Sequence, residues 1–321
     1  MSWTESLLYF GLGLVALSFG AEWLVRGASR IAVVLRVSPL VIGLTIVAYG
    51  TSTPEMMASV VAAVRDRADI TLGNVLGSNI ANIGLILGLV ALIAPLRVSM
   101  RLMRRELPIM VGVTLLFYFL AWRLYFGRFT GVGFLLGLVV FTVLVLRWAR
   151  HEPETIQAEY ESYDRAGRRS EHPVLRTSIL LAVGGMLVLF AGGDLVVRGA
   201  VPLARLMGIS DIVIGASLVA VGTSLPELAT ALVAARRRQA DIIIGNLVGS
   251  NLFNILGALG LSALIRPVQV APSLLRFEFL ALLLFTGAMA VVLYTGQRVS
   301  RAEGGVLLAS YVVFMVWLFL P

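Results

Sequence analysis

The chain has 321 residues, of which 59% are hydrophobic and 14% are charged, and its mean hydropathy is +0.93. This amount of apolar surface exceeds what a soluble globule can bury, so the composition excludes an ordinary water-soluble protein and makes lipid the expected solvent. The formal net charge of +8 does not indicate nucleic acid as a partner, because every basic residue is an arginine in or near a short connection between apolar runs.

Apolar runs long enough to span a bilayer recur along the whole chain. A membrane-spanning helix needs about 20 mostly apolar residues. The runs that meet this requirement are, in chain order, 5–30, 39–64, 70–94, 106–123, 129–148, 174–204, 210–235, 241–265, 277–295 and 303–320. The first run is too long for a signal peptide and is expected to remain as a span. We therefore predict an all-α polytopic membrane protein with ten transmembrane helices.

The distribution of arginine indicates how the chain is oriented. If the N-terminus lies outside the cytoplasm, the arginine clusters at 97–105, 147–176, 236–238 and 298–301 all fall on the cytoplasmic side. The positive-inside rule then places both termini outside the cytoplasm, in the inner (plasma) membrane of the cell. Membrane lipid is the expected surrounding, and no obligate protein partner is predicted.

The two halves of the chain repeat one another at a constant offset of 172 residues. Residues 48–55 (AYGTSTPE) match residues 220–227 (AVGTSLPE) at six of eight positions. Residues 69–82 (DITLGNVLGSNIAN) match residues 241–254 (DIIIGNLVGSNLFN) at eight of fourteen positions. The identities include every Gly, Asn, Asp and Ser of the second pattern, which a shared apolar composition would not reproduce.

Each half is therefore predicted to be one unit of five spans. Because five is an odd number, the second unit enters the membrane inverted relative to the first, a design in which secondary transporters place the substrate near the bilayer midplane. The predicted fold is thus two inverted five-helix repeats, at 1–149 and 174–321. The hydrophilic segment 150–173 is predicted to be a cytoplasmic linker, and it is too short for a folded regulatory domain.

Each repeat places one glutamate in the middle of a predicted span, at Glu55 and Glu227. A carboxylate at the bilayer centre costs at least about 2.5 kcal/mol, so it is rare there without a partner or a function. The proline before each glutamate is expected to open the helix and to free carbonyls around Ala48 and Ala220. In a waterless medium, a bound cation can satisfy such carbonyls, although a proline kink alone is the simpler interpretation of either motif.

Hydroxyl and amide side chains accompany the glutamates. Ser78 and Asn82 are four residues apart, so both lie on one helix face, and Ser250 and Asn254 repeat this spacing. Such residues also serve close packing and interhelical hydrogen bonds, which is the alternative interpretation. Hard oxygen ligands suit calcium, whereas zinc or copper would call for His or Cys. The chain has no Cys, and its two His residues lie outside the spans.

Four further acidic residues repeat at the same offset. Asp69 and Asp241 stand where the third span of each repeat begins, and we predict that they cap these helices. Two pairs at spacing i, i+4 are predicted to be intrahelical ion pairs; they are Glu22 with Arg26 and Asp194 with Arg198.

The paired motifs GTSTPE with GNVLGSNIAN and GTSLPE with GNLVGSNLFN resemble the calcium/cation antiporter superfamily, specifically its prokaryotic sodium/calcium exchangers. The resemblance covers nearly the whole chain and implies exchange of three sodium ions for one calcium ion by alternating access, without a cofactor. It implies that the ligands are Glu55, Glu227, Thr51, Ser52, Thr223, Ser224, Ser78, Ser250, Asn82, Asn254 and the carbonyls of Ala48 and Ala220. Some relatives, including potassium-dependent ones, have Asp where this chain has Asn82 or Asn254, which argues against potassium coupling here.

Three other functions are compatible with buried carboxylates. In a calcium/proton antiporter the two glutamates would carry protons instead of binding sodium, and the sequence leaves this alternative open. A cation channel is disfavoured by the inverted repeat, which favours alternating access. An intramembrane enzyme with an acid–base pair is disfavoured because the surroundings resemble an ion cage.

Overall fold

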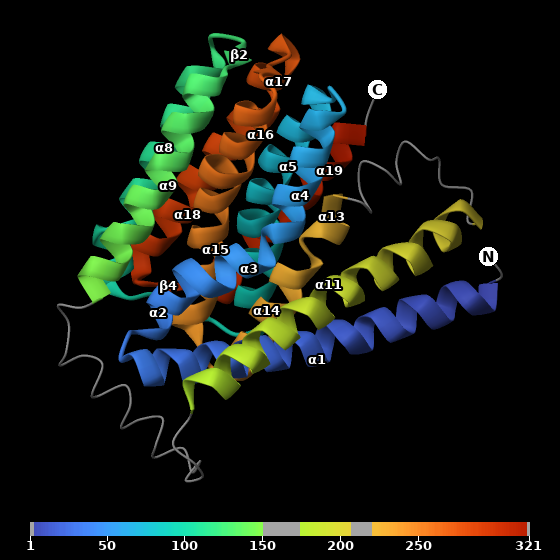
Figure 1. Ribbon diagram of the computed structural model, residues 1–321, viewed down its shortest axis with the longest axis vertical. Coiled ribbons are helices and arrows are strands. Elements are labelled where there is room, and N and C mark those ends of the chain that lie inside the picture. The colour runs from blue at the N-terminus through green and yellow to red at the C-terminus, as the bar shows by residue number, and fades with distance from the viewer. Residues whose placement is uncertain (1–2, 150–173, 207–219, 320–321) are drawn as a thin grey trace.

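The structure is a computed structural model that describes residues 3–149, 174–206 and 220–319 and is almost wholly helical (Figure 1). The predicted linker at 150–173 lies outside the described residues. The elements of the first half are α1 (Trp3–Leu35), α2 (Pro39–Ile42), the π-helix η1 (Gly43–Val47), α3 (Ala48–Thr51), α4 (Thr53–Val64), α5 (Ala68–Ala81), the π-helix η2 (Asn82–Leu87), α6 (Gly88–Ile93), β1 (Leu96–Arg97), α7 (Met100–Arg104), α8 (Glu106–Ala121), β2 (Tyr125–Phe126) and α9 (Arg128–Ala149).

The elements of the second half repeat this order, and most of their bounds lie 172 residues further on. They are α11 (Leu175–Leu206), α13 (Ala220–Thr223), α14 (Leu225–Arg236), α15 (Ala240–Leu252), the π-helix η4 (Phe253–Leu259), α16 (Gly260–Ile265), β3 (Val268–Gln269), α17 (Pro272–Arg276), α18 (Glu278–Gly296), β4 (Arg298–Val299) and α19 (Arg301–Phe319). The sequence repeat is therefore also a repeat of secondary structure.

Within the part of the chain that the structure describes, seven helical segments are long and apolar enough to cross a membrane. They are Trp3–Leu35, Ala68–Ile93, Arg128–Ala149, Leu175–Ala204, Ala240–Ile265, Pro272–Gly296 and Arg301–Leu318. The other three predicted spans give no such segment among the described residues. The span at 39–64 is broken into short helices, the span at 106–123 forms α8 of 16 residues, and the span at 210–235 begins outside the described residues. The count of ten therefore stays a prediction.

Helices α1 and α11 lie side by side and run at a large angle to the other helices (Figure 1). Their backbones touch because glycines stand at the contact. A Cβ on Gly20 would lie 2.7 Å from the nitrogen of Leu189, and one on Gly185 would lie 2.5 Å from the nitrogen of Leu24. Small residues permit this close approach of membrane helices. The glycines recur every seventh residue, as Gly13, Gly20 and Gly27 in α1 and Gly185, Gly192 and Gly199 in α11.

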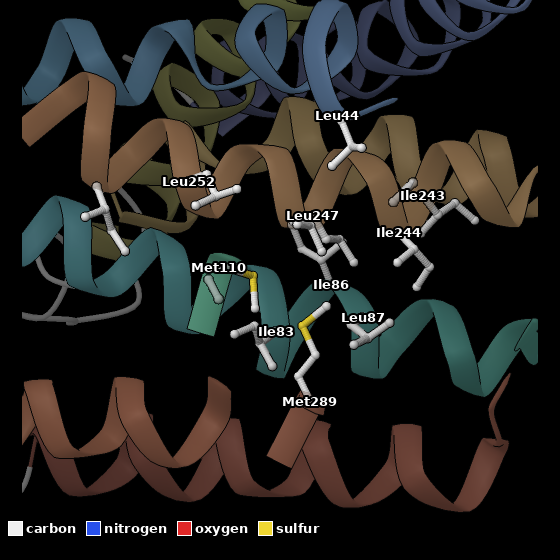
Figure 2. Close-up of a cluster of buried hydrophobic side chains, with 14 of the residues drawn as sticks. Leu44, Ile83, Ile86, Leu87, Met110, Ile243, Ile244, Leu247, Leu252 and Met289 are labelled. Carbon is white, nitrogen blue, oxygen red and sulfur yellow. The ribbon is translucent and has the colours of Figure 1, made fainter. Parts of the chain in front are cut away.

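Helix α15 and the π-helix η4 form the centre of the molecule. An 18-residue apolar window within Ala240–Ile265 is entirely buried, whereas only 22% of the corresponding window in α9 is buried. Figure 2 shows apolar side chains filling the space between α15 and η2, among them Ile244, Leu247, Ile86 and Leu87. Polar side chains on such a segment are remote from water and need specific partners.

Two short antiparallel ladders join the halves of the chain at opposite ends of the helical core (Figure 1). In one ladder β1 pairs with β4, so that Leu96 lies opposite Val299. In the other ladder β2 pairs with β3, so that Phe126 lies opposite Val268. Each ladder takes one strand from each half, which makes the two ladders equivalent under the repeat.

The prediction that Asp69 and Asp241 cap their helices is wrong. The N-cap residues are Arg67 in α5 and Gln239 in α15, and neither side chain forms a capping hydrogen bond. Since the helices begin one residue before the aspartates, both carboxylates lie within the first turn, where their charge complements the helix dipole. Both predicted i, i+4 ion pairs are confirmed, with N–O distances of 2.8 Å in the first repeat and 2.7 Å in the second.

Candidate functional site: a buried carboxylate pair

The two GTSxPE motifs form matching breaks in a helix. Helix α3 ends at Thr51 and α13 ends at Thr223. The serine that follows each of them, Ser52 or Ser224, has a ψ of 6° or 5°, respectively, and a new helix starts at the next residue. Pro54 and Pro226 lie in the first turn of the new helices, where the missing N–H of proline costs no intrahelical hydrogen bond. The predicted opening of the helix is therefore confirmed in both repeats.

The carbonyl of Ala48 is not freed by this break as predicted. It accepts a hydrogen bond from the backbone nitrogen of Ser52 at 3.0 Å. Proline removes the bond to the residue four positions earlier, which is Gly50 and not Ala48. A carbonyl oxygen has two lone pairs, so that of Ala48 can still contact an ion. Ala220 is the first residue of α13, and its side chain lies outside the described part of the structure.

Crossed hydrogen bonds bring the two motifs together in the interior. The Ser52 hydroxyl donates to Oε1 of Glu227 at 2.8 Å, and the Ser224 hydroxyl donates to Oε1 of Glu55 at 3.1 Å. The exposed fraction is 1% for Glu55 and 0% for Glu227. Within the described residues, no arginine forms an ion pair with either glutamate. The site therefore concentrates negative charge without a basic partner.

Part of the oxygen lining lacks hydrogen-bond partners. Within the described chain these atoms are Oε2 of Glu55, Oε2 of Glu227, Oδ1 of Asn82, Oγ of Ser250 and Oδ1 of Asn254, and the Nδ2 of Asn254 is likewise unpartnered. Leaving a buried polar atom unsatisfied costs about 1–3 kcal/mol. Two of these five oxygens belong to the carboxylate pair and three to amide or hydroxyl groups, which are the types of oxygen that a hard cation such as calcium binds.

Most of the other predicted ligands are buried in the same region. Thr51, Ser78 and Ala48 are at most 4% exposed, while Thr223 is only partly buried. Thr51 reaches the facing repeat because its hydroxyl donates to Oδ1 of Asn246 at 3.3 Å.

Asparagines that sequence reasoning did not select as ligands hold the site in place. The Asn74 side chain donates to the backbone carbonyl of Glu55 at 2.8 Å and to the Ser59 hydroxyl at 2.9 Å. The Asn82 side chain donates to Oδ1 of Asn251 at 3.1 Å. Asn74 and its repeat equivalent Asn246 belong to the identical positions of the GNxxGSN pattern, so the repeat itself was the signal that could have identified them.

The π-helices are a second feature that the sequence did not predict. Asn82 is the first residue of η2, and Asn254 is the second residue of η4. A π-helical turn contains an extra residue and therefore shifts the helix face that a side chain occupies. Such turns are rare and are found frequently at functional sites, and here they lie at equivalent places in both repeats.

Comparison with known families gives a match that covers the two halves separately. The sequence model of the "Sodium/calcium exchanger protein" family matches residues 5–147 and 177–320. The segment between the two matches contains the predicted linker.

Similar proteins of known sequence cover nearly the full chain. A putative antiporter, CaxA, from Alkalimonas amylolytica is 39% identical over 96% of this chain and 97% of its own length. The sodium/calcium exchanger MaX1 from Methanosarcina acetivorans is 35% identical over 98% of this chain and 99% of its own. The inner membrane protein YrbG from Escherichia coli is 35% identical over 96% and 94%.

The fold is also similar to that of a solved exchanger. A structure of the sodium-calcium exchanger NCX_Mj, soaked with sodium and strontium, aligns with a TM-score of 0.84 at 30% identity and covers 98% of this chain and 99% of its own. A second structure of NCX_Mj, soaked with sodium and calcium, aligns with a TM-score of 0.83 over the same shares.

Proposed function

This chain belongs to the sodium/calcium exchanger protein family, and we propose that it exchanges sodium for calcium across the membrane by alternating access. The observation that carries the proposal is the pair of crossed hydrogen bonds between Ser52 and Glu227 and between Ser224 and Glu55. Because each repeat supplies one carboxylate and one hydroxyl to its counterpart, a single ion between them would contact both halves.

The charge of the site supports calcium as one cargo. Two ionised carboxylates supply −2, which neutralises one calcium ion, and the surrounding oxygens can supply the six to eight ligands that calcium takes. Sodium ions in overlapping positions would satisfy the same oxygens. Occupancy by one cargo then excludes the other, as exchange requires. The ligands in this proposal are the twelve residues named from the sequence.

We infer the topology from the repeat and from the arginine distribution. Ten spans in two inverted repeats, at 1–149 and 174–321, would place both termini outside the cytoplasm and the 150–173 linker inside it. The repeated element bounds and the two family matches support this arrangement. Exchange of three sodium ions for one calcium ion would move one net charge in each cycle and would be electrogenic.

Calcium/proton exchange is the second candidate, because two buried carboxylates without a basic partner can also be neutralised by protons. The two candidates differ in what drives calcium uptake. We would reconstitute the purified protein in vesicles and measure calcium uptake driven by an outward sodium gradient, by a pH gradient, or by neither. Sodium-driven uptake that persists when an ionophore collapses the pH gradient is expected. Uptake that follows only the pH gradient would replace sodium by protons, and uptake without any gradient-coupled counter-ion would indicate a channel.

A further inference from the structure

An ion pair ties the tilted helix α1 to the core at one end of the molecule. Arg237, in the turn between α14 and α15, donates through Nε to Oε2 of Glu22 on α1 at 2.9 Å and through Nη2 to Oε1 of the same carboxylate. The side chains are 15% and 30% exposed, respectively. Arg26, one turn further along α1, holds Oε1 of Glu22 at 2.8 Å. Glu22 is thus shared between its own helix and the core.

The repeat provides equivalent acidic and basic residues at the other end of the core, but the structure pairs them differently. Adding or subtracting 172 relates Glu22 to Asp194, and Arg237 to Arg65. Asp194 is 56% exposed and pairs with its neighbour Arg198 at 2.7 Å. Arg65 is exposed, and the structure shows no ion pair between it and Asp194. One end of the molecule is therefore linked, and the equivalent link at the other end is open.

Packing of the two tilted helices shows the same asymmetry. Helix α1 packs along α14, whereas the described residues of α11 make at most a marginal contact with α4. The side chain of Gln239, next to α15, donates to the Ser29 hydroxyl on α1 at 2.9 Å. In addition, Met186 of α11 covers Gly50 in the helix break so closely that a Cβ there would lie 2.1 Å from its methyl carbon. The repeat equivalent of Met186 is Leu14, which is 46% exposed and does not reach Gly222.

From this asymmetry we propose that Glu22 and Arg237 form a latch that stabilises the conformation closed at the α14–α15 end, and that Asp194 and Arg65 form the equivalent latch in the opposite conformation. The proposal rests on alternating access, which belongs to the proposed function above. In an inverted repeat the two conformations exchange the roles of the two halves. The contact between Glu22 and Arg237 in this conformation therefore predicts a contact between Asp194 and Arg65 in the opposite conformation.

The i, i+4 arginines make this exchange possible at small cost. When Arg237 leaves Glu22, Arg26 remains as a partner for the carboxylate, just as Arg198 remains for Asp194 in the present conformation. A carboxylate left without any partner in a half-buried position would oppose the transition. The latch therefore stabilises its conformation only by the free energy of the second arginine partner of the carboxylate. For a partly exposed ion pair, this free energy changes the ratio of the two conformations about fivefold.

Cross-linking can test the latch without measuring transport. The chain has no cysteine, so introduced thiols are the only ones present. An ion pair of long side chains separates the backbones by more than a disulfide can span, so a short bifunctional thiol reagent is the suitable probe. We would compare the Glu22→Cys/Arg237→Cys and Arg65→Cys/Asp194→Cys double variants in detergent, with sodium alone and with calcium alone. Both variants are expected to cross-link. Cross-linking of 22 to 237 should trap one conformation, and cross-linking of 65 to 194 should trap the opposite one.

A charge change separates a latch from simple proximity. Adding Glu22→Gln to the Arg65→Cys/Asp194→Cys variant is expected to raise its cross-linking rate about fivefold, since it weakens the closed α14–α15 end. Exchanging the charges with Glu22→Arg and Arg237→Glu should lower the rate again toward its original value, which a mere loss of folding would not do; the recovery is expected to be partial, because the exchange places a second positive charge beside Arg26. Failure of the 65–194 pair to cross-link with either ion, or a rate indifferent to Glu22→Gln, would overturn the proposal. Neither readout depends on which ion drives calcium, so the latch and the proposed function can fail separately.

Discussion

Replacing one buried glutamate by glutamine removes charge from the site with almost no change of shape. Glu55 and Glu227 are at most 1% exposed, so water screens them very little. Removing one partner of a buried ion pair costs about 3–5 kcal/mol, and each 1.4 kcal/mol is a factor of ten in binding. We therefore expect Glu55→Gln and Glu227→Gln each to weaken calcium binding by about 10²- to 10⁴-fold.

The assay is a calcium titration by calorimetry on the purified protein in detergent without sodium. Asp69→Asn is the matched control, because it also removes one negative charge, but from an exposed ion pair with Arg67. Such pairs contribute about 0–1 kcal/mol, so calcium affinity should change by less than about fivefold. Glu55→Asp, which keeps the charge but shortens the side chain, should fall between the two.

Folding must be separated from binding in this experiment. Without calcium, the two carboxylates repel each other in the interior, so a glutamine variant should unfold at a temperature no lower than that of the wild type. A glutamine variant that is folded by this criterion and binds calcium within tenfold of the wild type would refute the assignment of the carboxylate pair. Loss in only one of the two variants would refute the shared site.

Three further outcomes are expected. Ser52→Ala and Ser224→Ala each remove one charge-assisted hydrogen bond, worth about 1.5–3 kcal/mol. Both changes should weaken calcium binding in the same titration by similar factors of at least about ten. A large difference between the two factors would contradict the crossed arrangement. Gly20→Ala should lower the thermal unfolding temperature, because the added Cβ meets backbone atoms of α11, whereas Gly11→Ala, with nothing within 4 Å, should not. In sodium-loaded vesicles, an inside-positive potential should accelerate calcium uptake if three sodium ions leave for each calcium ion, and indifference to potential would contradict that ratio.

Much of the candidate site could be predicted because the positions that are identical in the two halves include polar residues. Glutamate, serine and asparagine at equal offsets within apolar runs are costly in lipid, so their recurrence is informative without any structure. The pairing of Ser52 with Glu227 was not predictable from either motif alone, since it depends on how the two halves meet. The partner of Glu22 was missed for the same reason, because Arg237 lies 215 residues away along the chain.

Backbone details were less accessible. An asparagine at the start of a π-helix cannot be told from one in an α-helix by its sequence, because apolar residues flank it in both cases. The error over the Ala48 carbonyl has a different origin. The sequence prediction assigned the lost hydrogen bond to Ala48. The proline at position 54 in fact removes the bond to the carbonyl four residues earlier, which is that of Gly50.

The two strand ladders have a consequence for a cleaved form of the protein. They join Leu96 to Val299 and Phe126 to Val268, and the glycine-lined contact of α1 with α11 joins the halves again. Cutting the main chain between residues 150 and 173 would therefore yield two fragments that stay associated, as in a split protein. The same fragments, expressed as separate polypeptides, should recognise one another and reassemble in a single mutual orientation.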